Sequence, residues 1–238
     1  RICFKKLEDK DKKYLMLWKL FKTLSLKEFK KIYKELGIKF DYEDCESMHE
    51  KGIKRVMGEL NKKNIIKKSK GALIVDLTKF GLDVCLIQKT DGATLYATRD
   101  LAAAIKRYET YKFDKMIYEV GQEQNLHFKQ IFKILELMGY GFSKNCIHVG
   151  HGLYLDKKGK RFATRKGRTV FMEDIIEETE SLAKKEIKKR FPKLSQKEMD
   201  FRAHRVAIAA IFYGDLKNSR RNDIVFDLDK FVSFEGDT

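Results

Sequence analysis

The sequence predicts an α/β fold in which a parallel sheet with crossover helices is flanked by mainly helical segments. From residue 91 onward, short apolar runs alternate with segments of helical periodicity, as expected of a parallel sheet. Before and after that region, apolar residues recur at intervals of three and four, which indicates amphipathic helices. A single proline in 238 residues leaves such helices uninterrupted.

The first 90 residues are predicted to be mostly helical. Ser25, followed by Glu28, has the form of a capping box and is expected to start a second helix. Gly37 is expected to end it. In order, we predict two helices within residues 11–36, a short strand over 38–41, a helix over 47–60, and a β-hairpin of residues 72–77 and 84–88.

The middle of the chain is predicted to alternate between strands and helices. The expected elements are a strand over 95–97, a helix over 101–111, a strand over 115–120, a helix that ends at Gly139 and a strand over 146–149. Ligands of such sheets bind beyond the carboxyl ends of the strands. Residues 96–100, 121–124 and 148–152 are therefore expected to surround one crevice.

A glycine-bounded basic loop follows at residues 159–167, and two helices are predicted after it, over 173–190 and 197–213. The net charge is +16, and residues 1–70 carry 21 basic against 11 acidic residues, whereas residues 71–150 carry 10 against 9. A basic flank beside a near-neutral middle fits a small-molecule pocket next to a polyanion-binding surface. Solvated, lysine-rich helix faces are the alternative.

The cysteines give no metal-ligand spacing, because all four lie far apart without a Cys-x-x-Cys pair. We therefore expect free thiols, no protein-bound metal and a cytoplasmic location. The sequence has no run of 18 apolar residues and no signal-peptide pattern, so no membrane partner is expected. Because the chain opens at Arg1 without a methionine, we expect it to be a piece of a longer protein.

Three segments, in order, resemble arginyl-tRNA synthetases of the eukaryotic cytosolic kind, a family of class I synthetases. They are Asp91–Ala104 (DGATLYATRDLAAA), Gly121–Phe128 (GQEQNLHF) and Phe162–Gly167 (FATRKG). Residues 223–227 and 233–238 also look like the start of that family's anticodon-binding domain. The resemblance implies a helical connective insertion with a small β-hairpin over 1–90. It also implies the second half of a Rossmann-type catalytic domain over 91–171, and a helical stem-contact region with the start of the anticodon-binding domain over 172–238.

The resemblance assigns Tyr96, Asp100 and Gln124 to the L-arginine pocket. A guanidinium is recognised by a carboxylate that accepts parallel hydrogen bonds from a planar fork, which suits Asp100. From position alone, Asp100 could instead satisfy free amides at a helix start, and Gln124 could be a solvent-exposed residue of a first turn. His127 could be a nucleotide contact or a core histidine, and we favour the core.

The basic loop resembles the Lys-Met-Ser-Lys-Ser (KMSKS) loop of class I synthetases, which meets the negative charge that develops on the ATP phosphates. The resemblance gives catalytic roles to Thr164, Arg165 and Lys166. Phe162 and Ala163 stand where the family commonly has Met and Ser, a departure that bears on loop closure. As a bare pattern, such a loop is a solvated turn.

The remaining ATP contacts are assigned by resemblance to Gly121, His148, Val149 and Lys166. His148-Val-Gly-His151 also matches the His-x-Gly-His pattern of class I synthetases, but that motif opens a helix, and here it precedes a glycine and a turn. We therefore expect it not to be the phosphate motif, and expect the family's His-Ile-Gly-His motif to lie upstream of Arg1.

The resemblance implies an arginine–tRNA ligase that uses ATP with Mg²⁺ and has tRNA(Arg), L-arginine and ATP as partners. We expect the 238-residue chain alone to be inactive. Two alternatives stay open. One is another class I synthetase, such as one for cysteine or glutamate, of which the first would want zinc ligands that the cysteine spacing does not offer. The other is a non-catalytic RNA-binding module derived from a synthetase.

Overall fold

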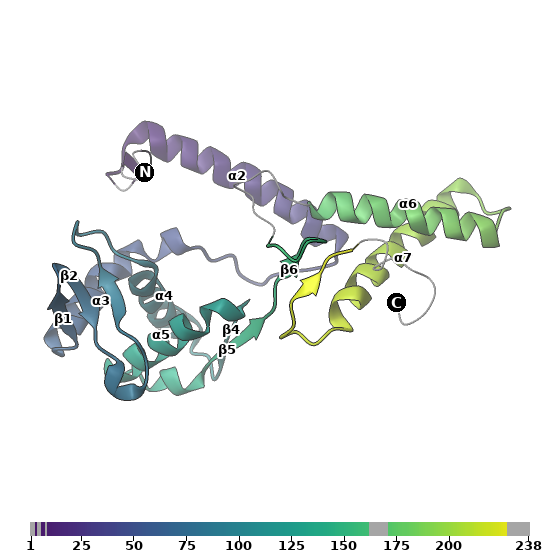
Figure 1. Ribbon diagram of the computed structural model, residues 1–238. Coiled ribbons are helices and arrows are strands. Elements are labelled where there is room, and N and C mark those ends of the chain that lie inside the picture. The colour runs from purple at the N-terminus through teal and green to yellow at the C-terminus, as the bar shows by residue number, and fades with distance from the viewer. Residues whose placement is uncertain (1–2, 4–5, 8, 162–170, 228–238) are drawn as a thin grey trace. The chain divides into compact units, whose positions relative to one another are not determined.

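The computed structural model describes residues 3, 6–7, 9–161 and 171–227, and these fall into two compact units (Figure 1). One unit comprises residues 42–154 with 219–224, and the other comprises residues 1–41, 155–218 and 225–238. The boundaries of these units differ from the functional domain boundaries that were predicted at 90/91 and 171/172. The functional division therefore stays a prediction. No helix in the described ranges is long and apolar enough to span a membrane.

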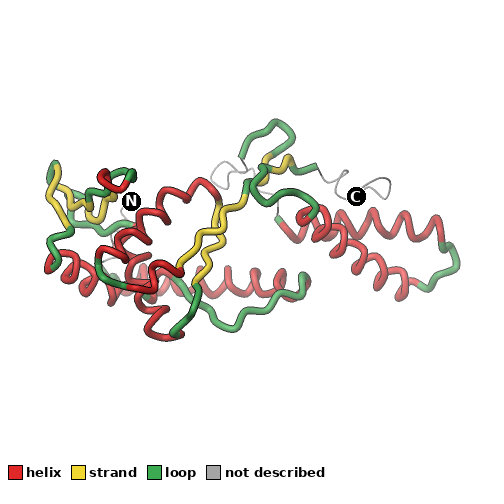
Figure 2. Tube along the Cα trace, turned by 90° about the horizontal axis from the view of Figure 1, so that it is seen from below, coloured by secondary structure: helices red, strands yellow, loops and turns green. Residues whose placement is uncertain are grey.

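The first unit contains a small antiparallel sheet and a parallel pair of strands, with helices packed beside them (Figure 2). Its elements are η1 (Glu46–Met48), α3 (Glu50–Lys62), β1 (Ile66–Ser69), β2 (Ala72–Val75), η2 (Thr78–Phe80), β3 (Cys85–Gln88), α4 (Tyr96–Tyr111), β4 (Met116–Gly121), η3 (Gln122–Gln124), α5 (Asn125–Leu137), η4 (Gly141–Asn145) and β5 (Cys146–His151). One hydrophobic core joins α3, the antiparallel sheet, α4 and α5. Its fully buried members include Leu60, Leu77, Ile87, Leu101 and Ile131.

The parallel pair is formed by β4 and β5, which run in register from Met116 opposite Cys146 to Gly121 opposite His151. The strands predicted over 115–120 and 146–149 are therefore confirmed, as is the helix that ends at Gly139, a residue with φ of +89°. Because the strands are parallel, their carboxyl ends lie at the same edge, where η3 and α5 begin. That edge is where the crevice was expected.

The antiparallel sheet has the order β1-β2-β3, so the predicted pairing of 72–77 with 84–88 is confirmed by β2 and β3. The sequence did not predict β1, because Ile66-Lys-Lys-Ser69 is mostly polar. A two-residue turn joins β1 to β2. Its residues Lys70 and Gly71 both have positive φ, as a type I′ turn requires.

The strand predicted over 95–97 is wrong. Tyr96 is the first residue of α4, and only a single bridge between Gln88 and Thr94 precedes the helix. Thr98 explains the early start, because its hydroxyl donates to the carbonyl of Ile87 at 2.7 Å and ties the first turn of the helix to β3.

The second unit consists of helices, with α6 (Met172–Arg190) and α7 (Gln196–Leu216) forming a hairpin (Figure 1). Both helices were predicted. Small side chains let them approach closely, since Ala183, Ala203 and Ala207 are fully buried. The strands β6 (Tyr154–Leu155) and β7 (Ile224–Val225) pair where the chain passes between the units.

The unit also contains α2 (Lys12–Glu35), a single helix of 24 residues where two were predicted. Asp11 caps it by accepting hydrogen bonds from the amides of Lys13 and Tyr14. Ser25 lies inside the helix and does not start a second one, because the apolar spacing continues on both sides of it.

Gly37 follows the end of α2 with φ of +68°, and Ile38 donates to the carbonyl of Tyr33, so the predicted glycine stop is confirmed. The strand predicted over 38–41 is wrong: that segment makes no strand pairing in the described part of the chain. A strand requires a partner for its backbone groups, which an apolar run alone does not supply.

Candidate functional site

The start of α4 is fixed on two sides. Thr98 is fully buried and bonded to β3 through Ile87. Arg99 donates to the carboxylate of Glu46 at 2.9 Å, which ties the helix to η1. The backbone that leads to the next residue, Asp100, is therefore held by contacts with β3 and η1.

Asp100 is the fifth residue of α4, beyond the first turn, and no acidic residue lies in that first turn. The alternative that Asp100 satisfies free amides at the helix start therefore does not hold, since only the first turn has them. Its Oδ2 lies 2.7 Å from Nε2 of His127 on α5. The side chain stays 37% exposed, and Oδ1 has no hydrogen-bond partner among the described residues. The carboxylate is thus held at one oxygen and open at the other.

Tyr96 lies at the start of α4, and Gln124 directly precedes α5. Tyr96 lies one turn before Asp100 on the same face of α4 and is 69% exposed. Gln124 is the exposed last residue of η3, three residues before His127. Within the described ranges, no hydrogen bond joins Tyr96, Asp100 and Gln124 to one another. Their common role as an arginine pocket stays a proposal.

Within the parallel pair, the side chain of His148 connects β5 to β4. Its Nε2 lies 2.9 Å from the carbonyl oxygen of Val120, so the ring nitrogen donates there. The ring stacks on the buried side chain of Phe128, with centroids 4.7 Å apart. Gly121 is buried at the end of β4, and Val149 lies in β5 opposite Glu119. Of the residues assigned to ATP by resemblance, Gly121, His148 and Val149 thus lie on the parallel pair of strands, and Lys166 lies outside the described residues.

His148 and His151 both lie in β5 and do not open a helix. The Nδ1 atom of His151 is 2.8 Å from the carbonyl of Gly152, so this ring is also committed to backbone. The structure therefore agrees with the expectation that His148-Val-Gly-His151 is not the phosphate motif of class I synthetases.

Residues 219–224 pass directly over the end of β5, an arrangement that the sequence did not predict. Gly152 donates to the carbonyl of Arg220 at 2.7 Å, and the guanidinium of Arg220 donates to the carbonyl of Gly150. A side chain at Gly152 would place its Cβ 2.0 Å from the carbonyl oxygen of Asn222. Two features of the sequence could have indicated this contact: a glycine that follows a strand, and the basic pair Arg220-Arg221.

A second group that the sequence did not predict surrounds Asp44. The buried His49 and Arg107 of α4 both donate to its carboxylate, at 2.8 and 2.9 Å. Burial opposes ionisation, but these hydrogen bonds outweigh it and lower the pKa of Asp44 below its ordinary value. Arg107 also lies over the ring of Tyr118, and burial raises the pKa of that phenol to about 12. This network attaches the segment before α3 to α4 and β4.

The predicted catalytic residues Thr164, Arg165 and Lys166 lie outside the described residues, as do Phe162 and Ala163. Among the described residues, no group of three or more His, Cys, Asp or Glu side chains could hold a metal ion. Cys85 and Cys146 are buried free thiols, and burial raises the pKa of each to about 11.

A family model described as "tRNA synthetases class I (R), catalytic domain" matches residues 1–228. The chain belongs to this family of class I synthetases. Curated relatives include the arginine–tRNA ligases of Clostridium acetobutylicum and Clostridium perfringens, each 47% identical over the whole chain. The chain spans 42% of the length of each of them.

Solved structures agree with the family assignment. The arginyl-tRNA synthetase of Plasmodium falciparum is similar with a TM-score of 0.82 and 25% identity, over 97% of this chain and 39% of that one. The arginyl-tRNA synthetase of Thermus thermophilus shares the fold, with a TM-score of 0.72 and 17% identity, over 98% of this chain and 47% of that one.

These findings confirm the resemblance to arginyl-tRNA synthetases and the predicted fold class: the second half of a class I synthetase parallel sheet, with helices before and after it. The eukaryotic cytosolic subtype is not supported, because the relatives at 47% identity are bacterial.

Proposed function

We propose that the natural full-length protein is an arginine–tRNA ligase. It activates L-arginine with ATP to arginyl-adenylate and transfers the arginyl group to tRNA(Arg). The family assignment and the names of its relatives support this reaction. The observation that carries the amino-acid specificity is the carboxylate of Asp100, which is held through Oδ2 and open at Oδ1.

The geometry around Asp100 suits a guanidinium. A partly exposed carboxylate with an open oxygen accepts charge-assisted hydrogen bonds from a planar, cationic fork. Tyr96, one turn earlier, provides an exposed ring on the same helix face, and Gln124 provides an amide at the start of α5. We assign Tyr96, Asp100 and Gln124 to L-arginine on this basis.

ATP is assigned to the carboxyl edge of β4 and β5. The rings of His148 and His151 donate to backbone carbonyls, so Gly121, His148 and Val149 are proposed to meet the nucleotide through their backbone. Thr164, Arg165 and Lys166 are proposed to act on the phosphates. Mg²⁺ commonly binds through substrate phosphates with few protein ligands, which fits a described region without a metal-binding cluster. Mg²⁺ is therefore proposed to arrive with ATP.

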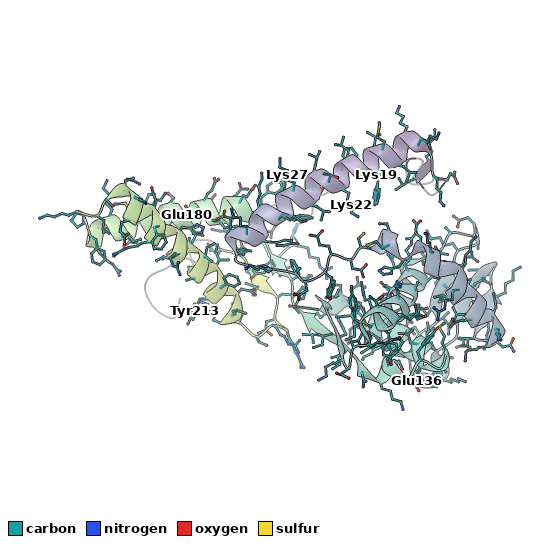
Figure 3. The ribbon with its side chains drawn as sticks, turned by 180° about the vertical axis from the view of Figure 1, so that it is seen from behind. Lys19, Lys22, Lys27, Glu136, Glu180 and Tyr213 are labelled. Carbon is teal, nitrogen blue, oxygen red and sulfur yellow. The ribbon has the colours of Figure 1, made fainter. Side chains whose placement is uncertain are left out.

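The partner tRNA is supported by the charge of α2, which carries eight lysines against two glutamates. Lys19, Lys22 and Lys27 project from this helix (Figure 3). Phosphate backbones bind such lysine-rich surfaces without regard to sequence. The cytoplasm is the proposed location of the reaction. The same lysines favour a second candidate function, an RNA-binding module without catalysis.

The two functions are separated by arginine binding to the natural full-length protein. L-arginine should raise its thermal unfolding temperature, and citrulline, which lacks the positive charge, should not. Asp100→Asn should remove the shift, because losing one charged partner costs about 2–5 kcal/mol. Asp114→Asn is the matched control, since this exposed acid lies before the opposite end of β4.

An RNA-binding module would show no arginine shift in either variant. The ligase also predicts tRNA-dependent ATP–pyrophosphate exchange by the full-length protein, which the 238-residue chain alone should not show. Exchange that is unaffected by Asp100→Asn would contradict the assignment of Asp100.

A further inference from the structure

We propose that His127 is a positioning residue that sets the carboxylate of Asp100 for the guanidinium of the substrate. The inference rests on the proposed function, because it takes Asp100 as the arginine ligand. The contact joins α4 to α5 through two residues that are 27 positions apart in sequence, with Nε2 of His127 2.7 Å from Oδ2 of Asp100. An ionised carboxylate only accepts hydrogen bonds, so Nε2 carries the proton in this contact.

The ring of His127 is itself held in place. It lies edge-on to Phe128, with centroids 5.3 Å apart and an interplanar angle of 74°. Phe128 is 6% exposed and stacks on His148 at 4.7 Å, and His148 donates to the carbonyl of Val120. A continuous set of contacts therefore runs from the backbone of β4 to the carboxylate of Asp100. His127 is not the core histidine that the sequence suggested, because 23% of its side chain is exposed.

This contact changes what Asp100 can do. A free carboxylate rotates broadly about its last torsion and would pay conformational entropy each time it bound a substrate. With Oδ2 engaged by His127, the plane of the carboxylate is set before arginine arrives, and Oδ1 stays open to the fork. A preorganised group of this kind lowers the cost of binding. His127 thus contributes to arginine affinity without having to touch arginine.

The test is a set of variants of the natural full-length protein, assayed for the KM of arginine and the KM of ATP. His127→Leu removes the donor and should raise the arginine KM about tenfold, in line with the loss of a hydrogen bond to a charged group. The KM of ATP should stay within about twofold of wild type. A general distortion of the site would instead raise the KM of both substrates. His127→Gln can place an amide nitrogen near the original Nε2 and should recover most of the loss, whereas the shorter His127→Asn should not.

A double-mutant cycle isolates the mechanism. In an Asp100→Asn background, His127→Leu should have little further effect, because the two residues act as one unit. Additive losses would overturn the proposal. His204→Gln is the matched control: His204 pairs with Glu180 at 2.5 Å in the other unit and should leave the arginine KM unchanged.

The outcomes distinguish this inference from the proposed function. If Asp100→Asn leaves the arginine KM unchanged, the proposed function fails. If Asp100→Asn raises it while His127→Leu does not, the proposed function stands and the positioning role is wrong. Should His127→Leu fail to fold, the comparison of His127→Gln with His127→Asn decides in its place, and equal arginine KM values for those two would overturn the proposal.

Discussion

Gly152→Ala should detach residues 219–224 from the end of β5. The new Cβ would lie 2.0 Å from the carbonyl oxygen of Asn222, 2.3 Å from its carbon and 2.8 Å from the amide of Asp223. These are backbone atoms, so no side-chain rotation relieves the clash. The two segments must separate by about 1 Å or more to restore ordinary contact.

That separation stretches two hydrogen bonds, from the amide of Gly152 to Arg220 at 2.7 Å and from the amide of Leu153 to the carboxylate of Asp223 at 2.8 Å. Together with the overpacking, their loss should cost about 2–4 kcal/mol. Amide hydrogen exchange measures this locally. The amides of Gly152 and Leu153 should exchange about 30-fold faster or more, since 1.4 kcal/mol corresponds to a factor of ten.

The matched control is Gly58→Ala. Gly58 lies inside α3, and a Cβ there meets nothing within 4 Å. Alanine should stabilise this helix by about 0.5–1 kcal/mol and leave the exchange at Gly152 unchanged. Unchanged protection of Gly152 and Leu153 in the Gly152→Ala variant would refute the argument that residues 219–224 are held against β5.

Two further predictions concern the supports of α4. Thr98→Val should destabilise the protein by about 1–3 kcal/mol in urea unfolding and raise the arginine KM, because it removes the bond to Ile87 at 2.7 Å. Thr98→Ser keeps the hydroxyl and should lose less, and equal losses in the two variants would show that the hydroxyl is not the cause. The lowered pKa of Asp44 stabilises the folded state above its ordinary pKa of 3.8, and this stability is lost as the pH falls through the lower folded-state value. Asp44→Asn should therefore lose less stability than wild type between pH 5 and pH 2 (about the range over which such a group titrates). Parallel pH curves for the two proteins would contradict the role of this carboxylate.

The sequence predicted the elements whose signals are local. Helical spacing located most of α5, α6 and α7, and short apolar runs flanked by loops located β4 and β5. The errors came from contacts between distant residues. The start of α4 at Tyr96 depends on the bond between Thr98 and Ile87, and β1 is recognisable only by its pairing with β2. Neither contact can be recognised from the local pattern of apolar and polar residues.

The candidate site, like the fold, could be predicted from the sequence only in part. Its motif residues could be identified by resemblance, because a motif carries residue type and spacing within one segment. The partners of those residues could not, since His127 meets Asp100 across 27 positions and Arg220 meets Gly150 across 70. His127 was nearest to being found, because it follows Gln124 by three residues on the first turn of α5.

The supports around Asp100 fit its proposed role in binding a charged group of the substrate. The two residues before Asp100 make hydrogen bonds to other elements, Thr98 to β3 and Arg99 to η1, so the backbone that leads to Asp100 is held in place. The side chain is then held from α5 by the contact between Oδ2 and His127. Two elements therefore hold the backbone at Asp100 and a third, α5, holds its carboxylate, whose Oδ1 has no hydrogen-bond partner in the described part of the chain. An acid whose only task was to stabilise the helix would need none of these contacts, because a place in the first turn would have been enough.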